Sequence, residues 1–582
     1  MKGTEVIVEA LKKEKVELVF GYPGGAVIPL FDQLYEETSI RVVLTRHEQA
    51  AVHAADGYAR STGKPGVCIV TSGPGATNTV TGLATANFDS VPLVCISGQV
   101  PRQMIGNDAF QEADTVGITR PVTKHNYLVT DVDRLGRIVR EGFFIASSGR
   151  PGPVVIDIPK DIMTSDTRKA IPETVHIRGY NPVTSGHTVQ IKRAATAINK
   201  ARRPLIFVGG GVHIANAAGE LMELLRKIGV PVVTSLMGIG AVPADNPLNL
   251  GMIGMHGSYA ANMAVQKADL LVGIGVRFDD RATGDLSRFA PEAQIIHIDI
   301  DPAAIARNVP VSIPIVGDAR KTLTDLLPLV ERRPPEEWLS EVRAYADYYR
   351  SMEEKNAESS GDLTARHIIE VLGTNFPEAI VSTEVGQNQM WAAQFFPFSK
   401  SRSWLSSGGL GTMGYGFPAA IGAQAGNPDK RVLVIAGDGS IQMNIQELAT
   451  AVLDRFPVII AILNNGYLGM VRQWQELFYD RRYAKTCLEA SVDCSPDCSD
   501  PKASGAGCPP YVPDFVALAK AYGALGLRAS TPGEAIKAVE TAVTTKDRPV
   551  IIDFIIPREE NVWPMVAPGA ALHEMLGKGG PL

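Results

Sequence analysis

Asp438 and Asn465 are the residues whose types and spacing point most directly to chemistry in this sequence of 582 residues. Asp438 lies between two glycines that follow a short apolar run at 432–436, and Asn465 comes just after a second such run at 458–463. Residues 440–456, between the two runs, carry apolar side chains at helical spacing. The pattern predicts a strand, a helix and a parallel strand, which places both polar side chains at the carboxyl ends of neighbouring strands.

This arrangement is suited to a particular kind of metal site. One carboxylate, one amide oxygen and a nearby backbone carbonyl are too few ligands to enclose a metal ion, but they suit a Mg²⁺ that takes its other ligands from water and a diphosphate. Ligands of doubly wound sheets bind at this edge, beside helix N-termini that favour phosphate. The sequence therefore predicts a magnesium–diphosphate site at Asp438 and Asn465; an ordinary strand–turn–helix is the alternative.

Glu48 and two glycine-rich segments are further candidates for the active site or a ligand-binding site. Glu48 follows the predicted strand 41–44, although by itself it reads more simply as a solvated glutamate that opens a helix. The glycines of residues 403–416 indicate backbone that passes close to a ligand. The turn Gly209-Gly210-Gly211 would let backbone approach a nucleotide phosphate, but it does not fit the pattern GxGxxG and is a weak signal alone.

Alternation of predicted strands and helices runs through most of the chain and predicts an α/β fold with three doubly wound parallel-sheet domains. We expect these domains at residues 1–185, 186–345 and 362–556. A linker that contains a helix over 336–355 separates the last two domains, and residues 557–582 form a C-terminal tail, either a lid or an interface arm. The first and third domains could be related copies, which the sequence alone does not establish.

Composition excludes several classes of partner. The chain is 45% hydrophobic and 20% charged, with a net charge of −6 and no long basic run, so neither nucleic acid nor an anionic membrane is expected to bind. The N-terminus lacks the apolar core of a secretory signal, and no apolar run approaches the ~20 residues of a membrane span. We therefore expect a cytoplasmic protein.

The six cysteines fall into two groups. Cys68 and Cys95 lie in apolar runs and are expected to be inert core thiols. The other four are spaced C-x6-C-x3-C-x9-C at Cys487, Cys494, Cys498 and Cys508. They could hold Zn²⁺ or an iron–sulfur cluster, form a redox-responsive thiol pair or remain free; stable disulfides are disfavoured in a cytoplasmic setting.

Longer motifs carry a family resemblance over nearly the whole chain. They include FGYPGGAVIPLFD, RHEQAAVHAADGYAR, TSGPGATN, AFQEAD, GRPGPVVIDIPKD, GMHG, GVRFDDR, HIDIDPA, VGQNQMWAAQ, GGLGTMGYGFPAAIGA, GDGS…NN and LGMVRQWQELFY. With these motifs the chain resembles the large, catalytic subunits of the acetohydroxyacid synthase (acetolactate synthase) family. GVRFDDR is the most specific of them, because the catabolic acetolactate synthases lack it.

The resemblance implies an activity, cofactors and partners. Family members join pyruvate to a second pyruvate, giving 2-acetolactate, or to 2-oxobutyrate, giving 2-aceto-2-hydroxybutyrate, in branched-chain amino acid biosynthesis. The three domains are then expected to bind the aminopyrimidine of thiamine diphosphate, a FAD without a redox role, and the diphosphate with Mg²⁺. Active sites lie between subunits, so a homodimer or tetramer is expected, together with a small regulatory subunit.

The resemblance also implies residue roles. Glu48 would hydrogen-bond the cofactor's pyrimidine, Arg277 would pair with the carboxylate of the second substrate, and Trp474 would select the larger one. Catalytic or substrate positions are further implied for Gly25, Phe110, Gln111, Lys160 and Met470. Thiamine diphosphate positions are Val385, Gly386, Gln387, Asn388, Gly411, Met413, Gly437, Asp438, Gly439, Ser440, Asn465, Leu468, Gly469 and Met470, with Asp438, Asn465 and the carbonyl of Tyr467 on Mg²⁺. FAD positions are Arg150, Gly209, Gly210, Gly211, His256, Gly275, Arg277, Asp299, Ile300 and Asp318.

One residue departs from the family pattern, and two alternative interpretations of the function stay open. Asn388 stands where the family usually has His, and we expect its amide to donate a hydrogen bond to the diphosphate instead. The chain could be another thiamine-diphosphate enzyme, such as a carboligase or an FAD-dependent pyruvate oxidase, or a non-catalytic protein that kept the fold. Glu48, Trp474, GVRFDDR and the intact metal motif favour the synthase.

Overall fold

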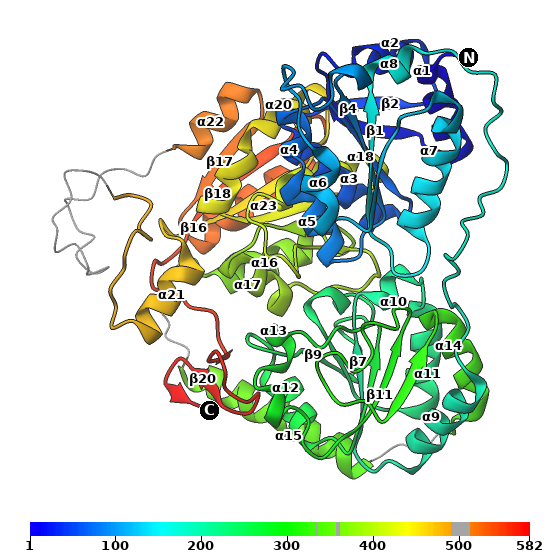
Figure 1. Ribbon diagram of the computed structural model, residues 1–582. Helices are drawn as coiled ribbons and strands as arrows, with labels where there is room; N and C mark the ends of the chain where they lie inside the picture. The colour runs from blue at the N-terminus through cyan, green and yellow to red at the C-terminus, as the bar shows by residue number, and fades with distance from the viewer. Residues whose placement is uncertain (332–335, 357–360, 491–512) are drawn as a thin grey trace.

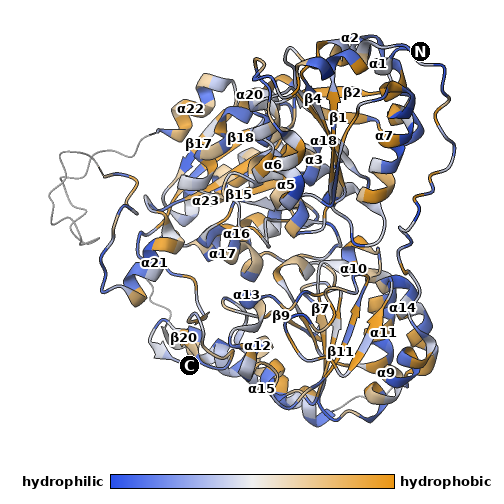
Figure 2. Cartoon of the chain, viewed as in Figure 1, coloured by the Kyte–Doolittle hydropathy of each residue, from blue (hydrophilic) through white to orange (hydrophobic). Residues whose placement is uncertain are grey.

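The computed structural model describes residues 1–331, 336–356, 361–490 and 513–582. Three six-stranded sheets, all with parallel strands, dominate these residues and follow one another along the chain (Figure 1). Figure 2 shows that the strands are the most hydrophobic parts of each sheet domain, with helices on both faces. The predicted α/β class with three parallel-sheet domains is confirmed.

The first and third sheets have the same strand order. The first runs β2-β1-β3-β4-β6-β5 and the third β14-β13-β15-β16-β18-β17, so each strand of the first sheet has a counterpart twelve strands later in the third. The first sheet consists of β1 (Leu18–Tyr22), β2 (Arg41–Leu44), β3 (Gly66–Val70), β4 (Leu93–Gln99), β5 (His125–Leu128) and β6 (Pro153–Pro159). The third consists of β13 (Ile380–Thr383), β14 (Trp404–Leu405), β15 (Val432–Gly437), β16 (Ile459–Asn464), β17 (Leu525–Ala529) and β18 (Val550–Ile555). Shared topology supports the idea that the two domains are related copies.

The middle sheet has a different order, β12-β11-β10-β7-β8-β9. Its strands are β7 (Pro204–Val208), β8 (Val232–Thr234), β9 (Asn249–Met252), β10 (Leu270–Ile274), β11 (Gln294–Asp299) and β12 (Ile313–Val316). The order reverses between β7 and β10, and this switch point is where open α/β sheets bind dinucleotides. Its covering helices include α9 (Thr188–Lys200), α11 (Ala218–Ile228), α12 (Tyr259–Lys267) and α14 (Ala319–Leu326).

Two helices join the first and third domains into one core. They are α3 (Glu48–Thr62) and α18 (Gly416–Gly426), which lie side by side between the two sheets. A Cβ atom on Gly57 would lie 2.0 Å from the carbonyl oxygen of Ala419, and one on Gly422 would lie 1.8 Å from that of Ala54. Because the backbones approach this closely, both positions require glycine.

The helix predicted over 440–456 is not continuous, which corrects our expectation. The segment divides into α19 (Asp438–Ile441), a 3₁₀ turn at Gln442–Glu447 and α20 (Leu448–Leu453). Asn444 has the non-helical angles φ −136° and ψ 29°, and its amide donates to the carbonyl of Gly414 at 2.6 Å. Competition by a short polar side chain for a tertiary partner therefore breaks the helix, which apolar periodicity could not reveal.

The remaining elements frame these domains. The other helices of the first domain are α1 (Gly3–Lys13), α2 (Ile28–Glu36), α4 (Pro74–Thr77), α5 (Val80–Phe88), α6 (Thr115–Thr119), α7 (Val132–Ser147) and α8 (Lys160–Thr164). Later in the chain come α10 (Gly211–Ile214), α13 (Asp280–Thr283), α15 (Glu336–Asn356), α16 (Ala365–Asn375), α17 (Gln387–Phe395), α21 (Gly469–Phe478), α22 (Phe515–Tyr522) and α23 (Pro532–Thr544). The tail forms a small antiparallel sheet of β19 (Met565–Val566), β20 (Met575–Gly577) and β21 (Gly580–Pro581). None of the helices in the described ranges is both long and apolar enough to cross a membrane.

Candidate functional site

Asp438 and Asn465 lie next to each other at the carboxyl edge of the third sheet, as the sequence predicts. Their strands, β15 and β16, are parallel neighbours in which Gly437 pairs with Leu463. One carboxylate oxygen of Asp438 accepts the N–H of Gly466 at 3.0 Å, and the side-chain oxygen of Asn465 accepts the N–H of Tyr467 at 3.0 Å. Both side chains are buried, so the loop that contains Tyr467 is folded around the two predicted ligands.

A chain of buried amides fixes the orientation of Asn465. Its amide nitrogen donates to the side-chain oxygen of Gln387 at 3.2 Å, and Gln387 in turn donates to Gln473 at 3.0 Å and to the carbonyl of Glu560 at 3.0 Å. Gln473 closes the chain by exchanging hydrogen bonds with the backbone of Val562. The amide oxygen of Asn465 is thereby directed away from Gln387, and the C-terminal tail is tied to the metal-site candidates.

Asn388 does not offer the donor that we expected. Its amide nitrogen donates to the carbonyls of Glu384 and Ile435, at 2.8 and 2.9 Å, so both N–H bonds are used by the backbone. The alternative amide orientation would face two carbonyls with an oxygen, which fixes the assignment. The side-chain oxygen instead lies beside Gly386 and Gly437, 3.2 Å from where a Cβ on Gly437 would be. Asn388 therefore presents an acceptor to this edge of the sheet.

Glu384 organises the glycine-rich loop next to this edge. It is fully buried, and its carboxylate accepts the N–H groups of Gly414 at 2.7 Å and Phe417 at 3.0 Å. Burial raises the pKa of Glu384 to about 7, against the opposing effect of these backbone donors. The bonds hold the N-terminus of α18 and the loop that carries Gly411 and Met413. Gly411 has φ +71°, and a Cβ there would meet no atom within 4 Å, so this backbone borders open space.

A cavity of about 1050 Å³ opens between the middle domain and this loop. It begins at the switch point of the middle sheet, where Gly210 and Gly211 follow β7 and Gly275 follows β10. The backbones of the two loops touch, because a Cβ on Gly211 would lie 2.6 Å from the Cα of Gly275. The predicted residues that line the cavity are Arg150, Gly210, Gly211, His256, Gly275, Arg277, Asp299, Ile300, Asp318, Val385, Gly386, Gly411, Met413, Met470 and Trp474. Gly209 is buried and does not line it.

Two buried nitrogens on residues that line this cavity have no hydrogen-bond partner among the described residues. They are Nδ1 of His256 and Nε1 of Trp474. Burial lowers the pKa of His256 to about 4, so its imidazole is neutral at pH 7. Buried polar atoms are nearly always satisfied in folded proteins, so these two nitrogens are candidates for a hydrogen bond to a polar ligand. The volume, the glycine loops and the unsatisfied nitrogens fit a dinucleotide.

Arg277 points across the domain boundary. One of its terminal nitrogens donates to the carbonyl of Phe88 at 2.9 Å, and the other lies 4.0 Å from Asp89 and 3.7 Å from Asp279. Its side chain is 32% exposed, so part of the guanidinium faces the cavity. Trp474 lies on the same cavity, with the guanidinium of Arg281 at 5.7 Å over its ring.

A separate cluster lies at the carboxyl edge of the first sheet. Glu48 begins α3, is 9% exposed and accepts the amide of Asn78 at 3.0 Å. A Cβ on Gly75 would lie 3.5 Å from a carboxylate oxygen of Glu48, and one on Gly73 would lie 2.8–3.0 Å from Gln111. Glu48 and Gln111 thus meet the same Ser72–Gly75 loop.

The structure does not bring every predicted residue to one place. Glu48, Gly25, Phe110, Gln111 and Lys160 do not line the cavity, although other first-domain residues, such as Phe88 and Arg150, do. Gly25 and Phe110 are exposed, Phe110 to 88%. Within one chain, these five candidates and the cavity therefore remain two partial sites. The diphosphate candidates Gln387, Asn388, Gly437, Asp438, Gly439, Ser440, Asn465, Tyr467, Leu468 and Gly469 lie around the strand edge next to the cavity and do not line it either.

The two cysteine groups have different outcomes. Cys68 and Cys95 are buried thiols on neighbouring strands, as predicted. Cys494, Cys498 and Cys508 lie outside the described residues. Cys487 is a half-buried free thiol, and its backbone forms an isolated antiparallel β-bridge with that of Tyr467. Across the described ranges no group of three or more His, Cys, Asp or Glu could hold a metal ion. The zinc or iron–sulfur interpretation has no support among the residues that the structure describes.

Sequence reasoning missed three acidic residues that organise the site. Glu384 holds the glycine-rich loop, and Asp89 accepts the N–H groups of Gly408 and Gly409 at 3.0 and 2.8 Å. Glu447 accepts the N–H of Arg46, two residues before Glu48, at 2.9 Å. All three act between segments far apart in sequence, so no local pattern marks them.

Comparisons with known proteins agree on one family. Three domain families match: the thiamine pyrophosphate (TPP) enzyme N-terminal TPP binding domain over residues 1–118, the central domain over 191–326 and the C-terminal TPP binding domain over 384–554. The chain is 48% identical to an acetolactate synthase large subunit of Corynebacterium glutamicum over 98% of this chain and 89% of that protein. It is 45% identical to the acetolactate synthase isozyme 3 large subunit of Escherichia coli K12 over 99% and 98%. A probable acetolactate synthase large subunit of Methanocaldococcus jannaschii is 46% identical over 99% and 95%.

Proposed function

Since this chain belongs to the acetolactate synthase large-subunit family of thiamine pyrophosphate enzymes, we propose that it condenses two pyruvate molecules to 2-acetolactate with loss of carbon dioxide. With 2-oxobutyrate as the second substrate the product is 2-aceto-2-hydroxybutyrate. These are parallel first steps toward the branched-chain amino acids. The adjacency of Asp438 and Asn465 at the edge of the third sheet, inside the matched TPP binding domain, is the observation that carries the proposal.

Thiamine diphosphate is the cofactor, as the two matched TPP binding domains indicate. The donor set at the third sheet, which is one carboxylate, one amide oxygen and the carbonyl of Tyr467, fits a Mg²⁺ that shares a diphosphate. We propose that Asp438, Asn465 and Tyr467 hold this ion and that the loops at Gly386 and Gly437 approach the diphosphate. When bound, the cofactor supplies a carbon that takes up the electron pair released as a 2-oxo acid loses carbon dioxide.

Flavin adenine dinucleotide fits the cavity at the switch point of the middle sheet. The glycine loops would lie against its diphosphate, and His256 offers an unsatisfied buried nitrogen. Arg150, whose guanidinium pairs with Asp301 at 3.2 Å, lies at the cavity wall and would contribute positive charge. The proposed reaction has no net oxidation, so the flavin would serve as a structural group.

The proposed residue roles follow from what each side chain can do. Glu48 is buried at the first turn of α3 and would hold or move a proton at its carboxyl oxygen. The guanidinium of Arg277 would receive the carboxylate of the second 2-oxo acid, which a planar fork binds well. Trp474 and Met470, both on α21, would set the space available to the substrate's alkyl group. Gly25, Phe110, Gln111 and Lys160 would line the site from the first domain.

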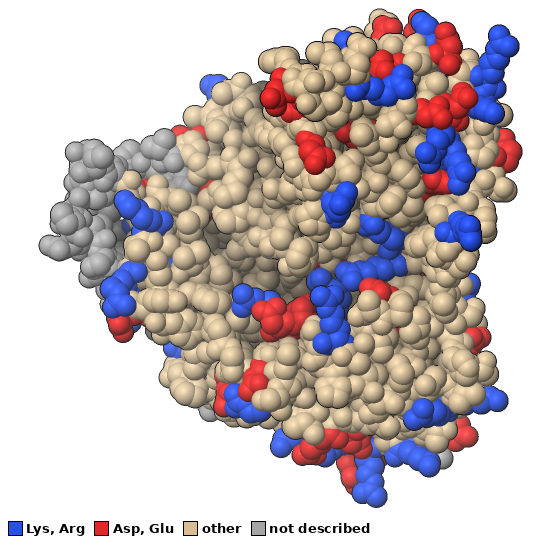
Figure 3. Space-filling view, in the orientation of Figure 1, with Lys and Arg blue, Asp and Glu red and all other residues tan. Residues whose placement is uncertain are grey.

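We infer a homodimer as the smallest active unit. Glu48 and the cavity are parts of two partial sites within one chain, and a second copy could join the first domain of one chain to the third domain of another. Figure 3 shows that a broad face of the first and third domains carries few charged side chains. Large exposed apolar residues in these domains include Ile28, Phe110, Met443 and Leu453. A tetramer, a small regulatory subunit, suggested by the large-subunit names of the relatives, and a cytoplasmic location remain predictions.

A product assay tests the function directly. Purified protein is incubated with pyruvate, with and without 2-oxobutyrate, and thiamine diphosphate, Mg²⁺ and FAD are each omitted in turn. We expect 2-acetolactate, and 2-aceto-2-hydroxybutyrate when 2-oxobutyrate is present, with activity dependent on thiamine diphosphate and Mg²⁺. Hydrogen peroxide or reduced flavin in place of these products would identify an oxidase and overturn the proposal.

A further inference from the structure

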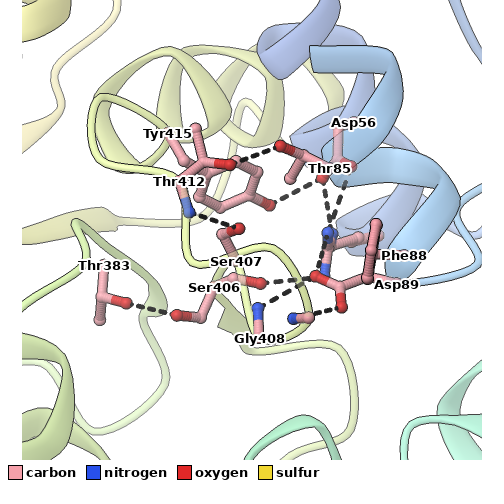
Figure 4. Close-up of polar contacts among 12 residues, drawn as sticks. Asp56, Thr85, Phe88, Asp89, Thr383, Ser406, Ser407, Gly408, Thr412 and Tyr415 are labelled. Atoms are coloured by element: carbon pink, nitrogen blue, oxygen red, sulfur yellow. Dashed lines mark hydrogen bonds and ion pairs between the residues drawn. The ribbon is translucent and has the colours of Figure 1, made fainter. Parts of the chain in front are cut away.

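Helix α5 of the first domain presents two polar side chains to the glycine-rich loop between β14 and α18 of the third domain. Thr85 lies in the last turn of α5 and Asp89 directly follows the helix. The N–H of Asp89 donates to the carbonyl of Thr85 at 3.2 Å, so the two side chains keep the i, i+4 spacing of one helix face. Both side chains are buried, and Figure 4 shows them facing the loop that carries Gly408 and Thr412.

Asp89 holds the first part of this loop. One carboxylate oxygen accepts the N–H of Gly408 at 3.0 Å, and the other accepts the N–H of Gly409 at 2.8 Å. The guanidinium of Arg60, on α3, donates to the same carboxylate at 3.1 Å and to the carbonyl of Ser406 at 3.1 Å. A Cβ on Gly409 would lie 2.9 Å from a carboxylate oxygen of Asp89, so the loop reaches the carboxylate because position 409 has no side chain.

Thr85 holds the loop four residues further along. Its hydroxyl donates to the carbonyl of Thr81 at 2.9 Å and lies 2.7 Å from the hydroxyl of Thr412. Because a hydroxyl has one proton, Thr412 is the donor in this pair. The N–H of Thr412 donates to the hydroxyl of Ser407 at 3.0 Å, which closes the loop on itself. Gly411 lies between the two points of attachment and lines the open cavity.

We propose that Asp89 and Thr85 are positioning residues that set the affinity for thiamine diphosphate by fixing the backbone around Gly411. The proposal rests on the function proposed above and on the assignment of Gly411 and Met413 to the thiamine diphosphate site. A loop that has to be ordered when its ligand binds lowers the affinity, whereas a loop held beforehand does not. The two attachments from α5 supply that order before the cofactor arrives.

The proposal assigns these two residues to an unexpected half of the assembly. Thr85 and Asp89 belong to the first domain, as Glu48 does, but they hold the third domain of their own chain. In the proposed homodimer Glu48 meets the third domain of the partner chain instead. Asp89 therefore acts together with Asp438 of the same chain and not with Glu48 of the same chain.

The first test is Asp89→Asn. Gly408, Gly409 and Arg60 are all donors to this carboxylate, so an amide NH₂ would have to face at least one of them. We expect the Kd of thiamine diphosphate, measured by calorimetric titration of cofactor-depleted protein at saturating Mg²⁺, to rise about 10- to 100-fold, as for the loss of one charge-assisted hydrogen bond.

Asp269→Asn is a matched control in the middle domain. Asp269 also accepts the N–H groups of two successive residues, Arg202 and Arg203, both at 2.8 Å, and it does not line the cavity. The change should lower the melting temperature, because the same kind of backbone attachment is lost. It should alter the Kd of thiamine diphosphate by less than about twofold, since the two positions share no partner.

Thr85→Val and Thr85→Ser test the second attachment. Valine removes the acceptor of the Thr412 hydroxyl and should raise the Kd of thiamine diphosphate about 3- to 10-fold. Serine keeps the hydroxyl and should stay within about twofold of the wild type. Thr412→Val should add nothing to the effect of Thr85→Val, because both changes remove the same contact. Fully additive effects would contradict the shared contact.

Hybrid dimers test which half of the assembly Asp89 serves. At thiamine diphosphate and Mg²⁺ concentrations that saturate only the wild type, a hybrid of Asp89→Asn and Glu48→Gln chains contains one unaltered site and should recover activity. A hybrid of Asp89→Asn and Asp438→Asn chains contains no unaltered site and should not recover it. Recovery in the second hybrid in place of the first would overturn the inference.

Gly409→Ala keeps the inference testable if Asp89→Asn fails to fold. Its methyl group pushes the loop away from Asp89 while every charge stays in place, so the Kd of thiamine diphosphate should again rise. A Kd equal to that of the wild type in Gly409→Ala, or in a folded Asp89→Asn, would overturn the inference. A wild-type protein that forms no acetolactate would instead overturn the proposed function, and an inactive hybrid of Glu48→Gln and Asp438→Asn chains would overturn the proposed homodimer.

Discussion

The first and third domains have the same strand order but different chemistry at the same edge. In each, the third strand in chain order is followed by a loop that begins a helix: Thr71–Gly75 after β3, and Gly437–Ser440 after β15. The loop of the third domain carries Asp438, whereas the loop of the first carries no carboxylate. The first domain instead has its buried carboxylate one connection earlier, at Glu48, where the third domain has the glycine-rich loop before α18.

In the function that we propose, one scaffold would serve two halves of a cofactor. Parallel strands place loop residues at one edge in both domains, and under this proposal the residue types in the loops would decide whether a charged diphosphate or a neutral ring is bound. The equivalent helices α3 and α18 pack against each other reciprocally, through Gly57 on Ala419 and Gly422 on Ala54. The two edges are therefore held in a fixed relation by a symmetric contact in the core.

The largest expected effect comes from changing Glu48, at the edge of the first sheet. Glu48→Gln should lower kcat for acetolactate formation by about 10²- to 10⁴-fold, because an amide cannot hold and release the proton of the carboxyl group. The amide of Asn78 can still donate to the new oxygen, so the melting temperature should not fall. Glu17→Gln, an exposed change in the same domain, is the control and should keep full activity. Survival of activity in Glu48→Gln would remove the proposed role of this residue.

A change at the edge of the third sheet should act through the binding of Mg²⁺. Asp438→Asn should weaken Mg²⁺ binding by about 10- to 100-fold, because a neutral amide replaces the only carboxylate we assign to the ion. The measurement is acetolactate formation as a function of Mg²⁺ concentration, with Asp429→Asn, an exposed change in the same domain, as the control. An unchanged Mg²⁺ dependence would contradict the assignment of Asp438 to the ion, and with it the proposed difference between the first and third domains.

The contact between α3 and α18 can be tested by measuring the free energy of unfolding. Gly57→Ala or Gly422→Ala places a methyl group about 2 Å from a carbonyl oxygen and should lower the free energy of unfolding by about 1–3 kcal/mol or more. Gly219→Ala is a matched helical change in α11 with no atom within 4 Å of the new methyl group, and it should be stabilising by about 0.4–1 kcal/mol. Urea unfolding of the three variants distinguishes close packing from a general effect of replacing glycine.

A smaller effect, on stability, is expected from Glu447, the third-domain acid that accepts the N–H of Arg46 in the first domain. Burial raises the pKa of Glu447 to about 7 from an ordinary 4.5, so the folded state binds more protons than the unfolded state between these values. Its contribution is then fully present below about pH 4.5 and is lost as the pH rises through about 7. The difference in unfolding free energy between wild type and Glu447→Gln should decrease from pH 5 to pH 8. A difference independent of pH would contradict the raised pKa.

Much of the fold was predictable because parallel strands leave strong local signals. Apolar runs such as 432–436 and 458–463 marked strands almost to the residue, and GDG with the later asparagine marked the sheet edge where we propose the metal ion. The break at Asn444 was not predictable, since it depends on a hydrogen bond to Gly414 from another part of the domain. The donors of Asn388 were misjudged for the same reason: two backbone carbonyls on other segments use them first.

The most direct test of the central claim combines the Glu48→Gln and Asp438→Asn variants. If Glu48 of one chain meets Asp438 of another, a hybrid of a Glu48→Gln chain and an Asp438→Asn chain contains one intact site and one doubly altered site. At a Mg²⁺ concentration too low for Asp438→Asn, mixed assembly of the two variants should therefore restore up to about a quarter of the wild-type acetolactate activity, well above what either variant shows alone. Hybrids that form, as verified by differential tagging, yet stay inactive would contradict a site built from the first domain of one chain and the third domain of another.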